Sequence, residues 1–334
     1  MLIVWLLVFA FCLFILIKAA DYFTDASEKI GTILKLPPVV IGILIVAVGT
    51  SAPELATSIF GVLKGEAAIL AGNIVGTVIA NILLGLGLVV VISWRVAKFN
   101  WDSVSNDMSF FLSAVVLLVL TCIDGIFNFW EAIIFLVGYV IYVIYSLDIK
   151  KQNPKKTRDD LHKEIKSKIK QDLKDDGEDK SVACKEDLTK LILIFIVSLL
   201  FILISAKYTI DSLLEIASIV GLGSSILATS IVAIGTSLPE ISVAVSSARK
   251  GNFDMVLGNI IGSNIFDIFV VFGAVGLFAN IPIPHEIIYV ALPFLVATIF
   301  VQWLVTMDRQ ITITEGMMMT LLYIVFIVKL YNIF

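Results

Sequence analysis

Long apolar stretches dominate this sequence, and ten of them come close to the length of about 20 residues that a helix needs to cross a bilayer. The composition agrees, since 59% of the residues are hydrophobic and 16% are charged. Soluble domains carry about 45–50% apolar and about 25% charged residues. The sequence therefore predicts an all-α integral membrane protein with ten transmembrane helices. The expected spans are residues 2–17, 38–63, 67–92, 108–123, 129–147, 188–207, 224–248, 255–279, 286–307 and 312–331.

Residues 148–187 form the one long hydrophilic stretch of the chain. Their acidic run does not follow the ligand spacing of an EF-hand calcium loop, so a solvated linker is expected. Basic residues mark the cytoplasmic side of a multi-pass protein. If the spans alternate, the linker shares one side with Lys29, Lys35, Arg95, Lys98, Arg249, Lys250 and Arg309. We therefore expect a cell-membrane protein with a cytoplasmic loop and both termini outside.

A nine-residue motif occurs twice in the chain, as VAVGTSAPE at 46–54 and as VAIGTSLPE at 232–240. The spacing of 186 residues continues without a gap to Asn81 and its partner Asp267. The two copies lie five spans apart, so they cross the membrane in opposite directions. Secondary transporters use such inverted repeats to place a binding site at the midplane.

The duplication divides the chain into three parts. Residues 1–147 form the first five-helix half, with its repeat at about 39–92. Residues 188–334 form the second five-helix half, with its repeat at about 225–279, and the loop 148–187 joins them.

Each motif copy places a glutamate, Glu54 or Glu240, inside an apolar span. An acidic residue at the centre of a membrane helix costs about 2.5–3.5 kcal/mol on insertion scales, and such residues are functional by default. Neither repeat offers a mid-span arginine or lysine as a partner. A bound cation is therefore the expected counter-charge.

The residues around the glutamates are sources of oxygen ligands. Pro53 and Pro239 lack a backbone N–H, which frees the carbonyls of Gly49 and Gly235 and predicts a kink. Hydroxyl oxygens come from Thr50, Ser51, Thr236 and Ser237. Hard ions such as Ca²⁺ and Na⁺ prefer oxygen ligands, and softer metals are disfavoured by the lack of His and Cys.

Further polar residues lie in the spans that follow each motif. Asn81 and Asp267 are equivalent and complete the candidate site, with a charge on one side only. Thr77, Ser263, Asn73 and Asn259 are secondary candidates, for which helix packing is an equal or better interpretation. Position 78 is valine where its partner is Asn264, so the two halves differ chemically.

The doubled motifs G-T-S-x-P-E and G-N-x-x-G-[ST] resemble those of the calcium/cation antiporter superfamily, and specifically its sodium/calcium exchanger branch. The resemblance implies ten helices in two inverted five-helix halves, with ions held by Glu54 and Glu240. It adds oxygens at the positions of Ala47 and Ala233 to the hydroxyl ligands. It also implies that Na⁺ entry drives Ca²⁺ out by alternating access.

Other functions stay open at this point. A proton-coupled or potassium-coupled Ca²⁺ exchanger is the main alternative, because Asp267 in GSNIFDI also resembles the potassium-dependent exchangers. A cation channel is a weaker rival, since the sequence has no filter-like loop. No enzyme is expected, because GTSAPE lacks the glycine of a serine nucleophile elbow. Expected partners are the lipid bilayer, Ca²⁺ and Na⁺, with no cofactor, nucleic acid or obligate protein partner.

Overall fold

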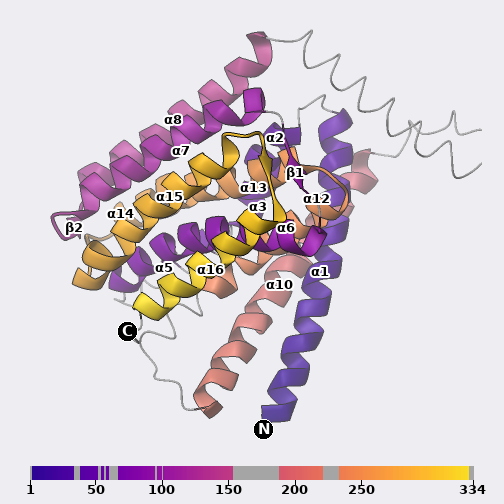
Figure 1. Cartoon of the computed structure of the whole chain (residues 1–334), viewed down its shortest axis with the longest axis horizontal. Coiled ribbons are helices and arrows are strands. Elements are labelled where there is room, and N and C mark those ends of the chain that lie inside the picture. Colours follow the sequence, from indigo (N-terminus) through magenta and orange to yellow (C-terminus); the bar gives the residue numbers. More distant parts are fainter. Residues whose placement is uncertain are drawn as a thin grey trace, which may run out of the picture.

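The structure is a computed structural model that describes residues 2–33, 38–51, 54–55, 58–59, 67–94, 96–99, 101–152, 188–220 and 233–330. Two very long helices, α1 (Leu2–Ile33) and α10 (Leu188–Val220), pack against each other at one side of the molecule (Figure 1). Each extends well beyond the span expected from its apolar run. The mixed-polarity segments that follow those runs therefore continue the helices.

The remaining elements form a bundle of shorter helices beside this pair (Figure 1). In the first half they are α2 (Pro38–Ile41), η1 (Gly42–Val46), α3 (Ala47–Thr50), α5 (Ala67–Ile79), η2 (Ala80–Leu86), α6 (Gly87–Ser93), α7 (Trp101–Cys122) and α8 (Phe129–Gln152). In the second half they are α12 (Leu238–Arg249), α13 (Phe253–Phe266), η3 (Asp267–Phe272), α14 (Gly273–Gly276), η4 (Ile287–Ala291), α15 (Leu292–Thr306) and α16 (Ile313–Leu330). The segments labelled η are π-helices.

Two continuous helical rods form the centre of the bundle. One consists of α5, η2 and α6, and the other of α13, η3 and α14. In an apolar stretch of 18 residues from each rod, 83% and 94% of the residues are buried. The corresponding fraction is 17% for α1 and 22% for α8, α10 and α16. The two rods are therefore surrounded by protein, whereas the apolar surfaces of the outer helices face outward, as suits contact with lipid.

Four two-residue strands form two short antiparallel ladders that the sequence did not predict. β1 (Ala97–Lys98) pairs with β4 (Gln310–Ile311), and β2 (Ile126–Phe127) pairs with β3 (Ile281–Pro282). Each ladder joins a loop of the first half to a loop of the second. The ladders lie in loops, where the chain leaves the bundle and its backbone groups need partners, and the architecture is otherwise helical as predicted.

Seven helices of the described residues are long and apolar enough to cross a membrane, which confirms a multi-pass helical membrane protein. A shorter apolar helix covers Asp107–Cys122. The described parts of the two motif-bearing segments are too short to count, so the number of ten spans stays a prediction. Most of the linker at 148–187 lies outside the described residues.

Close helix approach at a glycine positions the first motif against the second central rod. A Cβ added at Gly42 of η1 would lie 2.7 Å from the backbone nitrogen of Asn259 and 2.8 Å from the backbone oxygen of Met255. Both atoms belong to the backbone of α13 and cannot rotate away. Only glycine allows the motif segment to lie this close to α13.

Candidate cation-binding site

In both motif segments the regular helical backbone ends at equivalent serines, Ser51 and Ser237. Ser51 ends α3 with φ −82° and ψ 7°, and Ser237 precedes α12 with φ −76° and ψ −8°. A ψ near zero belongs to a sparsely populated backbone region in which many active-site residues lie. The backbone thus departs from regular helix near each predicted kink, and Pro239 lies in the first turn of α12, where its missing N–H costs nothing. Pro53 lies outside the described residues.

The hydroxyl residues of each motif interact with the glutamate of the other motif. Ser51 Oγ donates a hydrogen bond to Glu240 Oε1 at 3.3 Å. The Glu240 carboxyl also interacts with the hydroxyl of Thr50, and the Glu54 carboxyl interacts with the hydroxyl of Thr236. All of these side chains are at most 1% exposed. The predicted convergence of the two motifs is thus present in the fold.

The central rods add the next polar residues. Thr77 Oγ1 and Thr236 Oγ1 lie 3.4 Å apart, and Asn81 Nδ2 donates to Asn264 Oδ1 at 3.0 Å. The π-helices η2 and η3 begin beside Asn81 and at Asp267 respectively. Such wide helical turns are rare and often occur at functional sites. The equivalent placement of these two turns supports a functional role for the polar residues there.

Asp267 brings a third carboxyl to the cluster. It is fully buried and is close enough to Glu240 for an electrostatic interaction. Neither of its carboxyl oxygens has a hydrogen-bond partner among the described residues, and the same holds for Glu240 Oε2 and Asn81 Oδ1. Buried carboxylate oxygens without partners are costly unless a cation satisfies them.

The candidate ligands are carboxyl, hydroxyl, amide and carbonyl oxygens, which suit a hard cation. Within the described residues no three Asp, Glu, His or Cys side chains form a compact metal cluster.

The carbonyls of Ala47 and Ala233 already accept hydrogen bonds within their own segments. Ala47 O accepts from Ser51 N at 3.0 Å, and Ala233 O accepts from Ser237 Oγ at 2.8 Å. Ser237 therefore directs its hydroxyl to its own backbone. An ion at either carbonyl would have to use the remaining lone pair or displace such a bond.

The secondary candidates divide by their partners. Asn259 Nδ2 donates to the backbone oxygen of Glu240 at 3.2 Å, which ties the central rod to the motif helix. Ser263 Oγ donates to Ile260 O of its own helix at 3.2 Å. Asn73 is buried, and its Oδ1 has no hydrogen-bond partner among the described residues. Thr77, by contrast, reaches across to the second motif.

Asn264 joins the buried polar cluster of the candidate site, which the sequence alone did not indicate. It is fully buried, accepts from Asn81, and has an Nδ2 without a hydrogen-bond partner in the described part of the chain. The only signal was its mismatch with valine at position 78. Without the fold, that mismatch did not reveal the contact with Asn81.

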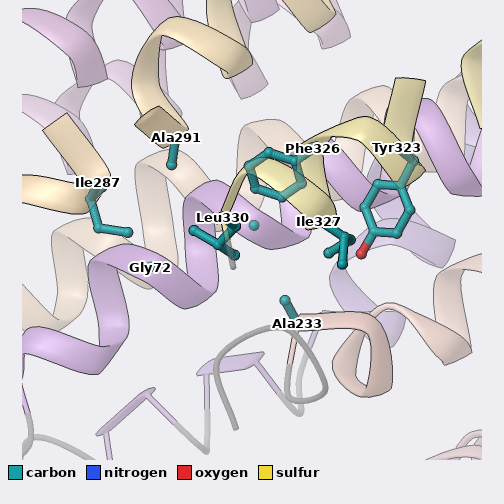
Figure 2. Close-up of a pocket in the computed structure, with 9 residues that line it drawn as sticks. Gly72, Ala233, Ile287, Ala291, Tyr323, Phe326, Ile327 and Leu330 are labelled. Atoms are coloured by element: carbon teal, nitrogen blue, oxygen red, sulfur yellow. The ribbon is translucent and has the colours of Figure 1, made fainter. Parts of the chain in front are cut away.

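A small apolar pocket borders the site. It is lined by Gly72 and Gly76 of α5, by η4 and α16, and by Ala233 of the second motif (Figure 2). The side chains of Ala291, Tyr323 and Phe326 lie on one side of it and Ala233 on the opposite side (Figure 2). Its lining is apolar, which does not suit binding of an ion.

Comparison with known proteins gives a consistent result. The model of the family described as "Sodium/calcium exchanger protein" matches residues 4–147 and 190–332. The sodium/calcium exchanger MaX1 of Methanosarcina acetivorans is 30% identical, over 95% of this chain and 96% of that protein. Sodium/potassium/calcium exchanger 1 of Gallus gallus is 29% identical, over 51% of this chain and 26% of its own length.

The fold also resembles solved structures. A structure of the sodium-calcium exchanger NCX_Mj, soaked with 2.5 mM Na⁺ and 0.1 mM Ca²⁺, superposes with a TM-score of 0.78. The two chains are 26% identical, and the match covers 97% of this chain and 98% of that one.

Proposed function

The chain belongs to the sodium/calcium exchanger protein family, and we propose that it exchanges Na⁺ for Ca²⁺ across its membrane by alternating access. The observation that carries this proposal is the crossed contact between the motifs. Hydroxyl groups of each motif copy interact with the glutamate side chain of the other copy in a fully buried cluster. The site residues proposed are Glu54, Glu240, Thr50, Thr236, Ser51, Ser237, Ala47, Ala233, Asn81 and Asp267, with Asn264 added.

Alternating access requires two halves that exchange roles, and several contacts support inverted halves. At a spacing of 184 residues β1 corresponds to β3 and β2 to β4. The pairing of β1 with β4 and of β2 with β3 is therefore one contact made twice between the halves.

Helix starts repeat at the same spacing. Asn128 N donates to Glu131 Oε2 at 2.7 Å, and Thr312 N donates to Glu315 Oε2 at 2.7 Å. Both are capping boxes, in which a glutamate satisfies a free N–H at the start of a helix. They support the proposed extension of the repeat over five helices, with halves at 1–147 and 188–334.

Coupling follows from the cost of an empty site. Three buried carboxyls without a cation would be strongly disfavoured, because desolvation costs several kcal/mol per ion. Only loaded states then reorient easily, which prevents leak and couples the two fluxes. If more than two Na⁺ are exchanged per Ca²⁺, each net charge moved is worth about 2.3 kcal/mol per 100 mV.

The orientation is also part of the proposal. The basic residues at the ends of α12 and near β1 and β4 support a cytoplasmic location for those loops and for the 148–187 linker. Both chain termini would then lie outside.

The test is ⁴⁵Ca²⁺ uptake into proteoliposomes under separate gradients of Na⁺, K⁺ and H⁺. Sodium alone is expected to drive uptake, and an absence of sodium-driven uptake would contradict the proposal. Uptake that needs both Na⁺ and K⁺ would favour the potassium-coupled alternative. That alternative is the second candidate because the carboxyl oxygens of Asp267 have no hydrogen-bond partner among the described residues. Uptake driven by a pH gradient alone would indicate proton coupling, and currents far above transporter turnover would indicate a channel.

A further inference from the structure

One hydrogen bond between the two central rods determines which polar atoms of two amide side chains stay free. Asn81 Nδ2 of η2 donates to Asn264 Oδ1 of α13 at 3.0 Å, and both side chains are at most 1% exposed. Asn81 Oδ1 and Asn264 Nδ2 have no hydrogen-bond partner among the described residues. The bond therefore leaves Asn81 with a free acceptor and Asn264 with a free donor.

The free atoms give these two residues different capabilities. A buried amide oxygen with unused lone pairs is a ligand for a hard cation, whereas an N–H group repels one. Asn81 has such an oxygen in the arrangement observed. The oxygen of Asn264 already accepts from Asn81, and its free atom is a nitrogen. Asn264 is thus unsuited to bind a cation itself, and its bond fixes which atom Asn81 offers.

The other half of the repeat has neither the amide nor its partner. At the repeat spacing of 186 residues, Asn81 corresponds to Asp267. At the same spacing, Asn264 corresponds to Val78, and all four side chains are buried. An ionised carboxylate has two equivalent oxygens, so Asp267 presents an oxygen whichever way its carboxyl group turns. The chain therefore has a hydrogen-bonding partner where the candidate ligand is an amide, and an apolar residue where it is a carboxylate.

We propose that Asn264 is a positioning residue that holds the amide of Asn81 with its oxygen towards the bound cation. The inference deepens the proposed function and rests on it, because Asn81 is there a ligand of the transported ion. Without the acceptor of Asn264, a half-turn of the Asn81 amide exchanges its oxygen and nitrogen. Part of the protein then presents N–H to the ion, and a ligand binds more weakly in proportion to the fraction of protein in the competent state.

The test is a double-mutant cycle on equilibrium ⁴⁵Ca²⁺ binding to the purified protein in detergent. Asn264→Val installs the residue of the other half and should raise the half-saturating Ca²⁺ concentration about tenfold. In the Asn81→Asp background the same change should raise it by less than about twofold, because a carboxylate needs no fixed orientation. An equal rise in both backgrounds, or no rise in the unmodified one, would overturn the proposal.

Asn259→Val is the matched control for this cycle. Asn259 is a fully buried asparagine of the same helix, but its Nδ2 donates to the backbone oxygen of Glu240 and not to Asn81. Its replacement should change Ca²⁺ affinity by the same factor with and without Asn81→Asp. If the carboxylate also abolished the effect of Asn259→Val, it would be masking general damage, and the proposal would be overturned.

The second half supplies the reverse test. Asp267→Asn places an amide at the position whose equivalent partner, Val78, has no polar side-chain atom. Addition of Val78→Asn should recover about threefold to tenfold of the Ca²⁺ affinity that Asp267→Asn loses. Absence of recovery would contradict the proposal. An equal gain from Val78→Asn with Asp267 in place would also contradict it, since the new amide would then bind the ion directly.

The outcomes separate this inference from the proposed function. If the protein exchanges Na⁺ for Ca²⁺ but Asn264→Val acts equally in both backgrounds, only the role of Asn264 is overturned. If it binds Ca²⁺ without exchanging it, the proposed function is overturned, and the binding cycle still decides on Asn264. A protein that neither binds nor transports Ca²⁺ would overturn both.

Discussion

Ser51 Oγ donates a hydrogen bond to Glu240 Oε1 at 3.3 Å, although the two residues lie 189 positions apart. The bond joins the interrupted end of α3 to the first turn of α12. A site built in this way belongs to neither half alone. An ion bound there would be held by both halves, which is what coupling of transport to a relative movement of the halves requires.

Removal of this hydroxyl should weaken ion binding without unfolding the protein. Ser51→Ala leaves Glu240 with one donor fewer, and hydrogen bonds to charged groups contribute about 1.5–3 kcal/mol. We expect the half-saturating Ca²⁺ concentration to rise about tenfold or more. Ser246→Ala is the control, since Ser246 lies on the same helix as Glu240, is buried, and its hydroxyl has no hydrogen-bond partner among the described residues. An equal effect in both variants would remove Ser51 from the site.

Asp267 should contribute charge to the site. Asp267→Asn makes the pair with Asn81 chemically equal and removes one of three buried carboxyls. We expect weaker ⁴⁵Ca²⁺ binding by about one order of magnitude, because a carboxylate is exchanged for a neutral oxygen ligand. Unchanged binding with normal folding would show that Asp267 carries no charge when Ca²⁺ is bound.

The close approach of η1 to α13 should make Gly42 irreplaceable. A Cβ there would lie 2.7 Å from a backbone nitrogen, so Gly42→Ala has to displace the motif segment. Overpacking of this kind typically costs about 1–3 kcal/mol. Gly85→Ala is the control, because the atom nearest to its Cβ would be in the flexible side chain of Ile241, at 3.3 Å. Thermal unfolding in detergent should show a clearly larger loss for Gly42→Ala, and equal losses would contradict the tight contact between η1 and α13.

The two capping boxes should contribute similar stability. Asn128→Ala and Thr312→Ala each remove an N-cap acceptor, at a cost of about 1 kcal/mol. Both should lower the thermal midpoint to a similar extent. Ser113→Ala, which removes only an exposed hydroxyl bonded to its own helix, should change it little. A strong effect of one cap alone would argue against equivalent helix starts.

The multi-pass helical character could be predicted from the sequence because membrane helices leave a clear signal in apolar length. The doubled motif indicated Glu54 and Glu240 as candidate site residues. The expected convergence of the two motif copies is present in the contact between Ser51 and Glu240. Span length and motif identity are legible in a sequence because they depend on residues close together in the chain.

Features that depend on contacts between distant segments were not predicted. The sequence leaves the extension of α1 to Ile33 open because its second part is polar, and that polarity is accommodated by contacts such as Lys250 Nζ with Asp25 Oδ1 at 2.6 Å. The hydrogen bond between Asn264 and Asn81 joins residues 183 positions apart, one in each half. Short strands such as β1 need a partner far along the chain, which local patterns do not reveal.

The central claim is that Glu54 and Glu240 together hold the transported ion. It is tested most directly by sodium-dependent ⁴⁵Ca²⁺ flux in proteoliposomes containing Glu54→Gln or Glu240→Gln, with folding checked by the thermal midpoint of each variant. Because glutamine keeps the size of the side chain but loses its charge, the account predicts loss of flux in both variants while the protein stays folded. Retained flux in both variants would contradict it.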